Sequence, residues 1–232
     1  MKRIACVVVL VAACTSSAGS DLPAQPTVTV PGTAPPPAVL ITGRACLVAI
    51  DPRALFECAA AGAGGLVVAL GSNSTTTLDD GSFSLQTPGG ASGMLQISGA
   101  GIASSAQAVG AINLVPAISS DLFAQMLADN EISLAPSTGS IIASVTNAEG
   151  QPIAGVTATS IPSASSGPFF DGTEPTQFGQ SETGNSGIVF FPGLTTLGPT
   201  TLGLTDSAGL ESTVDGVQVF DGGITYVAAP IP

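Results

Sequence analysis

The stretch Thr76-Thr-Leu-Asp-Asp-Gly-Ser-Phe-Ser-Leu85, or TTLDDGSFSL, sets the pattern of the fold. The β-branched threonines over 75–77 favour a strand, and Asp79-Asp80-Gly81 has the composition of a turn. Beyond this turn, residues 82–85 alternate polar and apolar side chains with the period of a half-buried strand. The stretch therefore predicts a β-hairpin that turns at Gly81, with Phe83 and Leu85 directed into a hydrophobic core.

Short apolar runs separated by turn residues repeat this pattern along the chain. In the first half they are 39–43, 66–70, 94–98 and 106–115. In the second half they are 140–146, 156–161, 187–191, 201–204, 214–220 and 224–228. Many short strands between Gly, Pro, Asn and Asp turns are typical of β-sandwiches. The chain is therefore predicted to be all-β, with two sandwiches in tandem.

Two motifs resemble the carboxypeptidase regulatory-like domain, a transthyretin-like β-sandwich. Thr76–Leu85 is similar to the T-T-x-x-D-G-x-F-x-L segment of that family, and Gly150-Gln-Pro-Ile-Ala-Gly-Val156 is similar to its G-x-P-x-x-G-V segment. Each half carries one motif clearly and the other loosely. The resemblance implies tandem transthyretin-like, immunoglobulin-like sandwiches over 39–118 and 139–232, and it implies a module that is not itself an enzyme.

Residues 119–138 are predicted to form a short helical connector between the two sandwiches. Within Ser120–Ala128 the apolar side chains of Leu122, Phe123, Met126 and Leu127 fall on one helical face. One apolar face does not say which core covers it. The helix is therefore either a connector or a part of the first sandwich.

The N-terminal residues resemble the signal of bacterial lipoproteins. Lys2 and Arg3 precede ten apolar residues, too few for a membrane span of about twenty but typical of a secretory signal. Val11-Ala-Ala-Cys14 resembles the lipobox, which implies that residues 1–13 are removed and that Cys14 is lipidated. The alternative is an ordinary cleaved signal with a chance cysteine. Thr15 lacks the Asp that favours the inner membrane in that family, so the resemblance implies the outer membrane.

Residues 14–38 are predicted to be an extended tether between the lipidated Cys14 and the first sandwich. The segment contains no long apolar period, and its prolines are Pro23, Pro26, Pro31, Pro35, Pro36 and Pro37. Such Pro-rich segments adopt a semi-rigid polyproline conformation. The tether is expected to hold the folded part away from the membrane.

The charge balance excludes several kinds of partner. Without residues 1–13 the chain keeps 219 residues, two Arg and sixteen carboxylates, a net charge of −14. So few cations exclude binding to nucleic acid through its phosphates and electrostatic adhesion to anionic lipids. The membrane is therefore expected as a partner only through the acyl chains on Cys14, and stable anchoring takes more than one chain.

The absence of His, and of Lys beyond residue 2, argues against most enzymes. Catalytic triads, Ser-Lys dyads, Schiff bases and zinc hydrolases all need one of these residues. We therefore expect no enzyme, no catalytic residues and no cofactor. A set of acids (Asp79, Asp80, Asp171, Glu174, Asp215 and Asp221) suits only calcium. Because no calcium-binding motif spacing is present, these acids are interpreted as solvated turn residues, and no metal is expected.

Cys46 and Cys58 are predicted to form a disulfide. Cys6 lies in the signal and Cys14 is the lipidation site, which leaves these two in a compartment that oxidises thiols. Buried free thiols are the alternative. Asp51 and Pro52 suit the start of a helix, so a helix of one or two turns is predicted over 51–58.

Phe169 and Phe170 are the candidate ligand-binding residues. They lie in a polar loop, 163–175, where two adjacent aromatic side chains would form an exposed lip. Side chains folded back onto the core are the alternative. The sequence thus predicts a non-enzymatic lipoprotein of the cell envelope with a structural or interaction role. The alternative is a binding module for envelope polysaccharide or a partner protein, acting through 163–175.

Overall fold

The computed structural model describes residues 37–55, 63–89, 92–179 and 181–232, and in these ranges the chain is all-β with one short helix. Residues 36–232 form one compact unit. The first strands are β1 (Ala38–Val48), β2 (Val67–Leu70), β3 (Asn73–Thr76), β4 (Ser82–Pro88), β5 (Met94–Ser98), β6 (Ser105–Ala108) and β7 (Leu114–Ile118). Helix α1 (Ser120–Asp129) follows them. The remaining strands are β8 (Thr138–Thr146), β9 (Thr157–Ile161), β10 (Phe169–Phe170), β11 (Ile188–Thr195), β12 (Thr200–Thr205), β13 (Glu211–Val217) and β14 (Ile224–Pro230).

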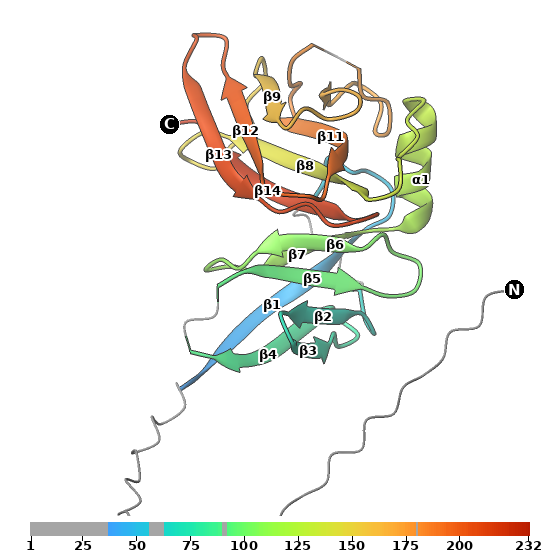
Figure 1. Cartoon of the computed structure of the whole chain (residues 1–232), viewed down its shortest axis with the longest axis vertical. Helices are drawn as coiled ribbons and strands as arrows, with labels where there is room; N and C mark the ends of the chain where they lie inside the picture. The colour runs from blue at the N-terminus through green and yellow to red at the C-terminus, as the bar shows by residue number, and fades with distance from the viewer. Residues whose placement is uncertain (1–36, 56–62, 90–91, 180) are drawn as a thin grey trace, which may run out of the picture. The chain divides into compact units, whose positions relative to one another are not determined.

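The described strands form three sheets that pack as β-sandwiches (Figure 1). An eight-stranded sheet has the order β10-β11-β8-β14-β6-β5-β2-β3. The sheet β4-β1-β7 packs on its β6-β5-β2 end, with Phe83 and Leu85 of β4 buried as predicted. The sheet β13-β12-β9 packs on its β11-β8-β14 end. The predicted β-sandwich fold class is confirmed.

Strand β14 connects the two ends of the large sheet. It runs parallel to β8 on one side, with Ile224 opposite Ser140. On its other side it runs parallel to β6, with Ile224 opposite Ser105. The sequence did not predict this pairing. The boundaries 39–118 and 139–232 stay a prediction, but strands from both ranges share one sheet.

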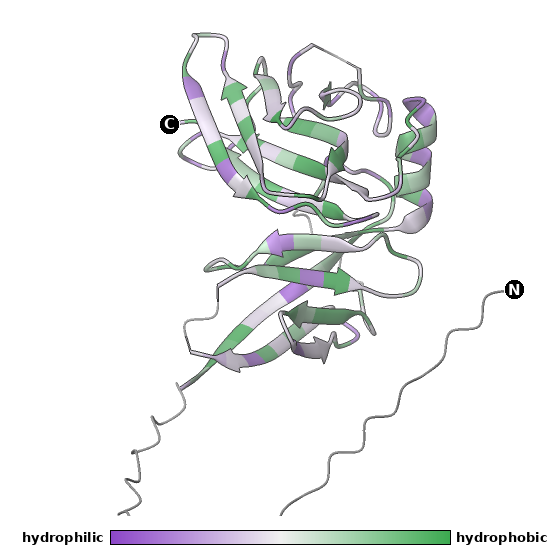
Figure 2. Cartoon of the chain, viewed as in Figure 1, coloured by the Kyte–Doolittle hydropathy of each residue, from purple (hydrophilic) through white to green (hydrophobic). Residues whose placement is uncertain are grey.

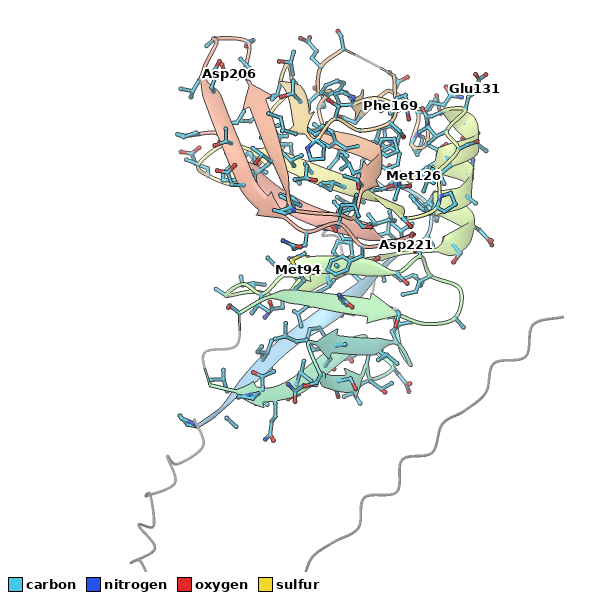
Figure 3. The ribbon with its side chains drawn as sticks, viewed as in Figure 1. Met94, Met126, Glu131, Phe169, Asp206 and Asp221 are labelled. Atoms are coloured by element: carbon cyan, nitrogen blue, oxygen red, sulfur yellow. The ribbon has the colours of Figure 1, made fainter. Side chains whose placement is uncertain are left out.

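Helix α1 forms where the sequence predicts it and buries the predicted face. The Ser119 hydroxyl caps its first turn by accepting from the backbone N–H of Leu122, at 3.2 Å. Leu122, Phe123 and Met126 are buried, and Figure 3 shows Met126 directed from α1 toward the strands. The cluster around them contains residues from β1 and β7 as well as from β8, β11 and β14. The helix therefore packs against strands of both halves.

The predicted hairpin at Thr76–Leu85 is wrong, although its turn is present. Gly81 has a φ of 82°, and its N–H donates to the Leu78 carbonyl. The strands that flank the turn belong to different sheets, because β3 pairs with β2 and β4 pairs with β1. The actual hairpin joins β2 to β3 through Gly71 and Ser72. Gly71 has a φ of 58°, as a two-residue hairpin turn requires.

Cys46 is buried and disulfide-bonded. Its predicted partner Cys58 lies outside the described residues, so the pairing stays a prediction. Of the helix predicted over 51–58, residues 51–55 are described and form turns instead. The Asp51 carboxylate bonds there to the Arg53 backbone N–H and guanidinium, which stabilises a tight turn. The signal, Cys14 and nearly all of the tether also lie outside the described residues.

Candidate functional site

Phe169 and Phe170 do not form the exposed lip that the sequence suggested. They make the two-residue strand β10, which pairs with β11 so that Phe169 lies opposite Phe190. The two side chains then point to opposite faces of the sheet. Phe170 is 4% exposed and packs in the core beneath β9, β12 and β13. Phe169 is half-buried against the cluster that includes α1. Both rings therefore serve the core, which is the alternative stated for this loop.

The rest of this loop is fastened by Asp171. Its carboxylate is 2% exposed and accepts the backbone N–H groups of Gly184, Ser186 and Ile188 at 2.9 to 3.0 Å. These bonds fix the segment that leads into β11. A carboxylate with three backbone donors is satisfied without a metal or a cation. The hydrogen bonds of Asp171 thus indicate a structural role in ordering this loop and no catalytic role.

Residues 172–178, at the end of this loop and just after it, are also attached to the end of helix α1 and to the first half of the chain. The Asn130 side chain donates to the Thr176 carbonyl and accepts from the Phe178 N–H. The Arg53 guanidinium donates to the carbonyls of Gly172 and Thr173, both at 3.1 Å. Arg53 also pairs with Asp51 at 2.7 Å. Hydrogen bonding to Arg53 is the main cause that lowers the pKa of Asp51.

The acids considered for calcium do not converge in the described part of the chain. No group of three His, Cys, Asp or Glu side chains that could hold a metal ion occurs among those residues. The Asp80 carboxylate instead accepts from the backbone N–H and hydroxyl of Ser82, which lowers its pKa. The Asp215 carboxylate accepts from the Thr201 hydroxyl at 2.8 Å. These acids order turns and strand edges.

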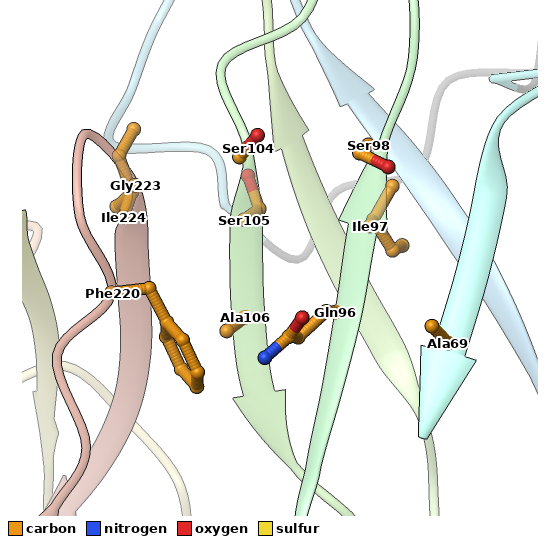
Figure 4. A pocket seen from close by; sticks show the side chains of 10 residues that line it. All are labelled: Ala69, Gln96, Ile97, Ser98, Ser104, Ser105, Ala106, Phe220, Gly223 and Ile224. Atoms are coloured by element: carbon orange, nitrogen blue, oxygen red, sulfur yellow. The ribbon is translucent and has the colours of Figure 1, made fainter. Parts of the chain in front are cut away.

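A groove lies on the open face of the eight-stranded sheet, opposite the core beneath β4-β1-β7. Its deeper part has a volume of about 100 Å³ and lies over β2, β5 and β6, beside the segment that leads into β14 (Figure 4). A wider part of about 530 Å³ lies past Met94, at the edge of the sheet, between the turn that joins β2 to β3 and the end of β4 at Thr87 and Pro88. Gln96 and Phe220 line both parts. We call this surface the Phe220 groove.

The floor of the Phe220 groove consists of small side chains in one row across the sheet. Ala69 lies opposite Gln96, and Gln96 lies opposite Ala106. Because Ala69 and Ala106 are small, they leave space between the sheet and the Phe220 ring. Figure 4 shows the Gln96 amide directed across Ala106 toward that ring. The floor of the groove is therefore formed by strands, and the long polar side chain of Gln96 lies at its centre.

The wall that carries Phe220 is held in place by hydrogen bonds. The Gly223 N–H donates to the Phe220 carbonyl at 3.0 Å, which closes a turn. The buried Thr225 hydroxyl donates to the Gln218 carbonyl at 2.7 Å. Gly139 lies against the Phe220 carbonyl, where any side chain would collide with it. The ring thus stands at a fixed place beside the floor.

Sequence reasoning did not single out Gln96 or Phe220. Gln96 occupies the polar position in the alternating segment Met94–Ser98, which identifies it only as an outward residue. Phe220 precedes a DGG turn, which gives no sign of the surface that it faces. The pairing of β14 with β6 brings them together, and no local pattern encodes that pairing.

A second polar cluster is buried beside β14. The Tyr226 side chain is 2% exposed, and burial raises the pKa of its hydroxyl. The hydroxyl lies near Ser105 and the Ile118 backbone, but neither group meets the geometric criteria for a hydrogen bond with it. A tyrosine in this environment stays protonated. The cluster belongs to the interior and offers no reacting group at the surface.

Comparisons with known proteins give no family for the chain. No family model matches it, and no curated protein matches it in sequence. Among solved structures, a streptococcal ancillary pilin is similar at 9% identity and a TM-score of 0.25, over 83% of this chain and 69% of the pilin. The Bacillus anthracis TIE protein is similar at 11% identity and a TM-score of 0.24, over 83% of this chain and 34% of that protein.

The shaft pilin spaA of Lactobacillus rhamnosus GG is a third similar structure. It has 9% identity and a TM-score of 0.22, over 84% of this chain and 99% of the pilin. At such values these likenesses carry no argument about function. Among the described residues, no helix is long and apolar enough to cross a membrane.

Proposed function

We propose that this chain is a non-enzymatic lipoprotein of the bacterial envelope, displayed on a tether at the outer membrane. The observation that carries the proposal is the sequence Val11-Ala-Ala-Cys14, placed after Lys2, Arg3 and a ten-residue apolar run. In this proposal residues 1–13 are removed and Cys14 carries the acyl chains. These acyl chains must provide the attachment to the membrane, because the rest of the protein has almost no cations that could bind anionic lipids.

The folded part acts as a structural or interaction module in this proposal. The absence of His throughout, and of Lys beyond residue 2, supports a role without chemistry. The carboxypeptidase regulatory-like identity of the two halves belongs to the same proposal, and it rests on Thr76–Leu85 and Gly150–Val156. The described grooves lie on strands of a packed scaffold, which suits recognition and spacing.

The test is acylation of Cys14 in cells. The full chain is expressed in a Gram-negative host with labelled palmitate, and its partition into a detergent phase is measured. Wild-type chain is expected to carry label and to enter the detergent phase, whereas Cys14→Ser loses both. Cys6→Ser is the matched control, because Cys6 lies within the predicted signal, and it is expected to behave as wild type.

Two outcomes would overturn the proposal. One is label that persists in Cys14→Ser, and the other is wild-type chain without label. Density separation of the membranes then tests the location of the protein, because the wild type is expected in the dense outer-membrane fraction.

A further inference from the structure

We propose that the Phe220 groove binds a neutral saccharide chain. The proposal goes beyond the function above and does not depend on the lipid anchor. It rests on the chemistry of the lining, on its fixed geometry and on the charge of the chain. The residues that carry it are Asn73, Gln96, Ser98, Ser104, Gln218 and Phe220.

The lining is neutral and combines one aromatic ring with amides and hydroxyls. None of the described residues that line the two parts of the groove is ionisable. The C–H face of a sugar ring packs on an aromatic ring, and its hydroxyls bond to amides and hydroxyls. Ligand sites commonly combine an apolar surface with a few polar groups that fix orientation.

The positions of these groups fit such a ligand. Phe220 supplies a wall and Ala106, which is 2% exposed, supplies the floor beneath it. Gln96 is exposed and lies between the two parts of the groove, so its amide is within reach of a ligand in either part. The hydroxyls of Ser98 and Ser104 lie at one end (Figure 4). Asn73 and Gln218 line the other end.

The groove requires little ordering when a ligand binds. Its floor consists of paired strands, and hydrogen bonds from Gly223 and Thr225 hold the Phe220 wall. A site that is rigid before binding avoids part of the entropy that association costs. The two parts, about 100 and 530 Å³, share Gln96 and Phe220 in their linings, which favours several sugar units over a single one.

The net charge selects among polysaccharides. A chain with sixteen carboxylates and four basic residues repels anionic polymers. A site for an anionic glycan would need Arg or Lys in its lining, and neither occurs among the described residues that line the groove. The ligand class is therefore a neutral, hydroxyl-rich chain, as opposed to a uronic acid polymer.

The test measures binding of defined oligosaccharides to the full chain by isothermal titration calorimetry. The protein is kept in lauryldimethylamine oxide, because detergents with sugar head groups would compete. The neutral probes are maltohexaose, cellohexaose and chitohexaose, and hexagalacturonate is the anionic probe of equal length. At least one neutral probe is expected to bind, and hexagalacturonate is expected not to bind.

Variants locate the site. Phe220→Ala is expected to weaken binding at least about tenfold, and Gln96→Ala about threefold or more. Phe220→Leu keeps an apolar side chain and removes the ring, so it covers the case in which Phe220→Ala does not fold. Leu197→Ala is the control, since Leu197 is 93% exposed and does not line the groove.

Three outcomes overturn the proposal. The first is no heat from any neutral probe up to about 10 mM, a concentration that detects even weak sites. The second is equal binding by wild type and by folded Phe220→Leu and Gln96→Ala. The third is a dimer in light scattering that Gln96→Lys dissociates, which would assign the groove to a second copy of the chain.

Discussion

The two ends of the eight-stranded sheet differ in how they are covered. Strands β8 and β11 are buried on both faces, by β13-β12-β9 on one side and by α1 with the segment around Phe178 on the other. Strand β5 is buried on one face only, so its residues alternate between buried and exposed. Figure 2 shows the difference in colour, because apolar residues predominate along β11 while β5 alternates between apolar and hydrophilic ones.

This difference assigns separate roles to the two ends. A sheet that is covered on both faces stabilises the fold but offers no surface. In a sheet that is covered on one face, the side chains of the other face are not constrained by packing and are accessible to a ligand. The Phe220 groove lies on that open face. Substitutions should therefore affect stability at one end and binding at the other.

The largest effect is expected for Phe190→Ala at the doubly covered end. Phe190 is fully buried and contacts the rings of Phe123 and Phe178, at centroid distances of 6.5 and 5.7 Å. Its removal should lower the free energy of unfolding by about 3–5 kcal/mol. Urea unfolding followed by circular dichroism measures this. Gln96→Ala on the open face should change it by less than about 0.5 kcal/mol. Equal effects for the two variants would contradict the comparison.

The next effect is expected for Asp171→Ala, which releases the loop over the second face of β11. Three backbone N–H groups would lose their carboxylate acceptor, so we expect a loss of roughly 3 kcal/mol. Thermal unfolding and hydrogen exchange at residues 184–188 measure it. Asp79→Ala, at an exposed turn position, should leave both unchanged. A loss below about 1 kcal/mol would mean that water replaces the carboxylate.

A smaller effect is expected for Thr225→Val on β14, the strand that joins the two ends of the sheet. The substitution keeps the shape and removes the hydrogen bond to the Gln218 carbonyl, at a cost of about 1 kcal/mol. It also loosens the Phe220 wall, so saccharide binding should weaken more than it does in Leu197→Ala. Unfolding and calorimetry on the same samples separate the two effects. Unchanged binding together with reduced stability would show that the wall does not depend on this bond.

The smallest effect is expected from the pair of Arg53 and Asp51, in which Arg53 also bonds to the carbonyls of Gly172 and Thr173 in the second half. Both side chains are partly exposed, at 20% and 32%, so solvent screening limits the pair to about 0.2–1 kcal/mol. The folded-state pKa of Asp51 lies below its ordinary value of 3.8. The contribution is therefore complete above about pH 5 and is lost as the pH falls through 3.8 and then through the folded-state pKa.

The pH dependence of that pair can be measured with Arg53→Ala. The difference in unfolding free energy between wild type and variant should be constant from pH 5 to 7 and should decrease toward pH 2. The carbonyl bonds to Gly172 and Thr173 do not titrate, so a residual difference should remain. A difference that grows on acidification would contradict this account of Asp51.

Local patterns predicted much of the secondary structure but not its pairing. The alternation at Ser82–Leu85 and the apolar face of Ser120–Ala128 were identified correctly, because burial imposes a period on each segment by itself. The hairpin at Gly81 was wrong because a turn has the same composition whether it joins paired strands or two sheets. The hairpin signal lies instead in the Gly71-Ser72 turn, a Gly-Ser pair between two short strands.

The candidate site could not be predicted, because it depends on contacts between distant segments. Phe169 and Phe170 stood out in the sequence, yet pairing with β11 directs both rings inward. Gln96 and Phe220 did not stand out, yet they meet because β14 pairs with β6. Such contacts follow from the packing of whole sheets, and no periodicity records them.

Strand β14 also affects the order in which the chain can fold as it is synthesised. Both of its neighbours, β6 and β8, precede residues 224–230 in the sequence and are therefore synthesised first. Until then each of them has an unpaired edge, and such edges join with other chains. In an incomplete chain the two strand edges at 105–108 and 138–146 are therefore the segments most exposed to such association. Both edges become paired when β14 inserts between them.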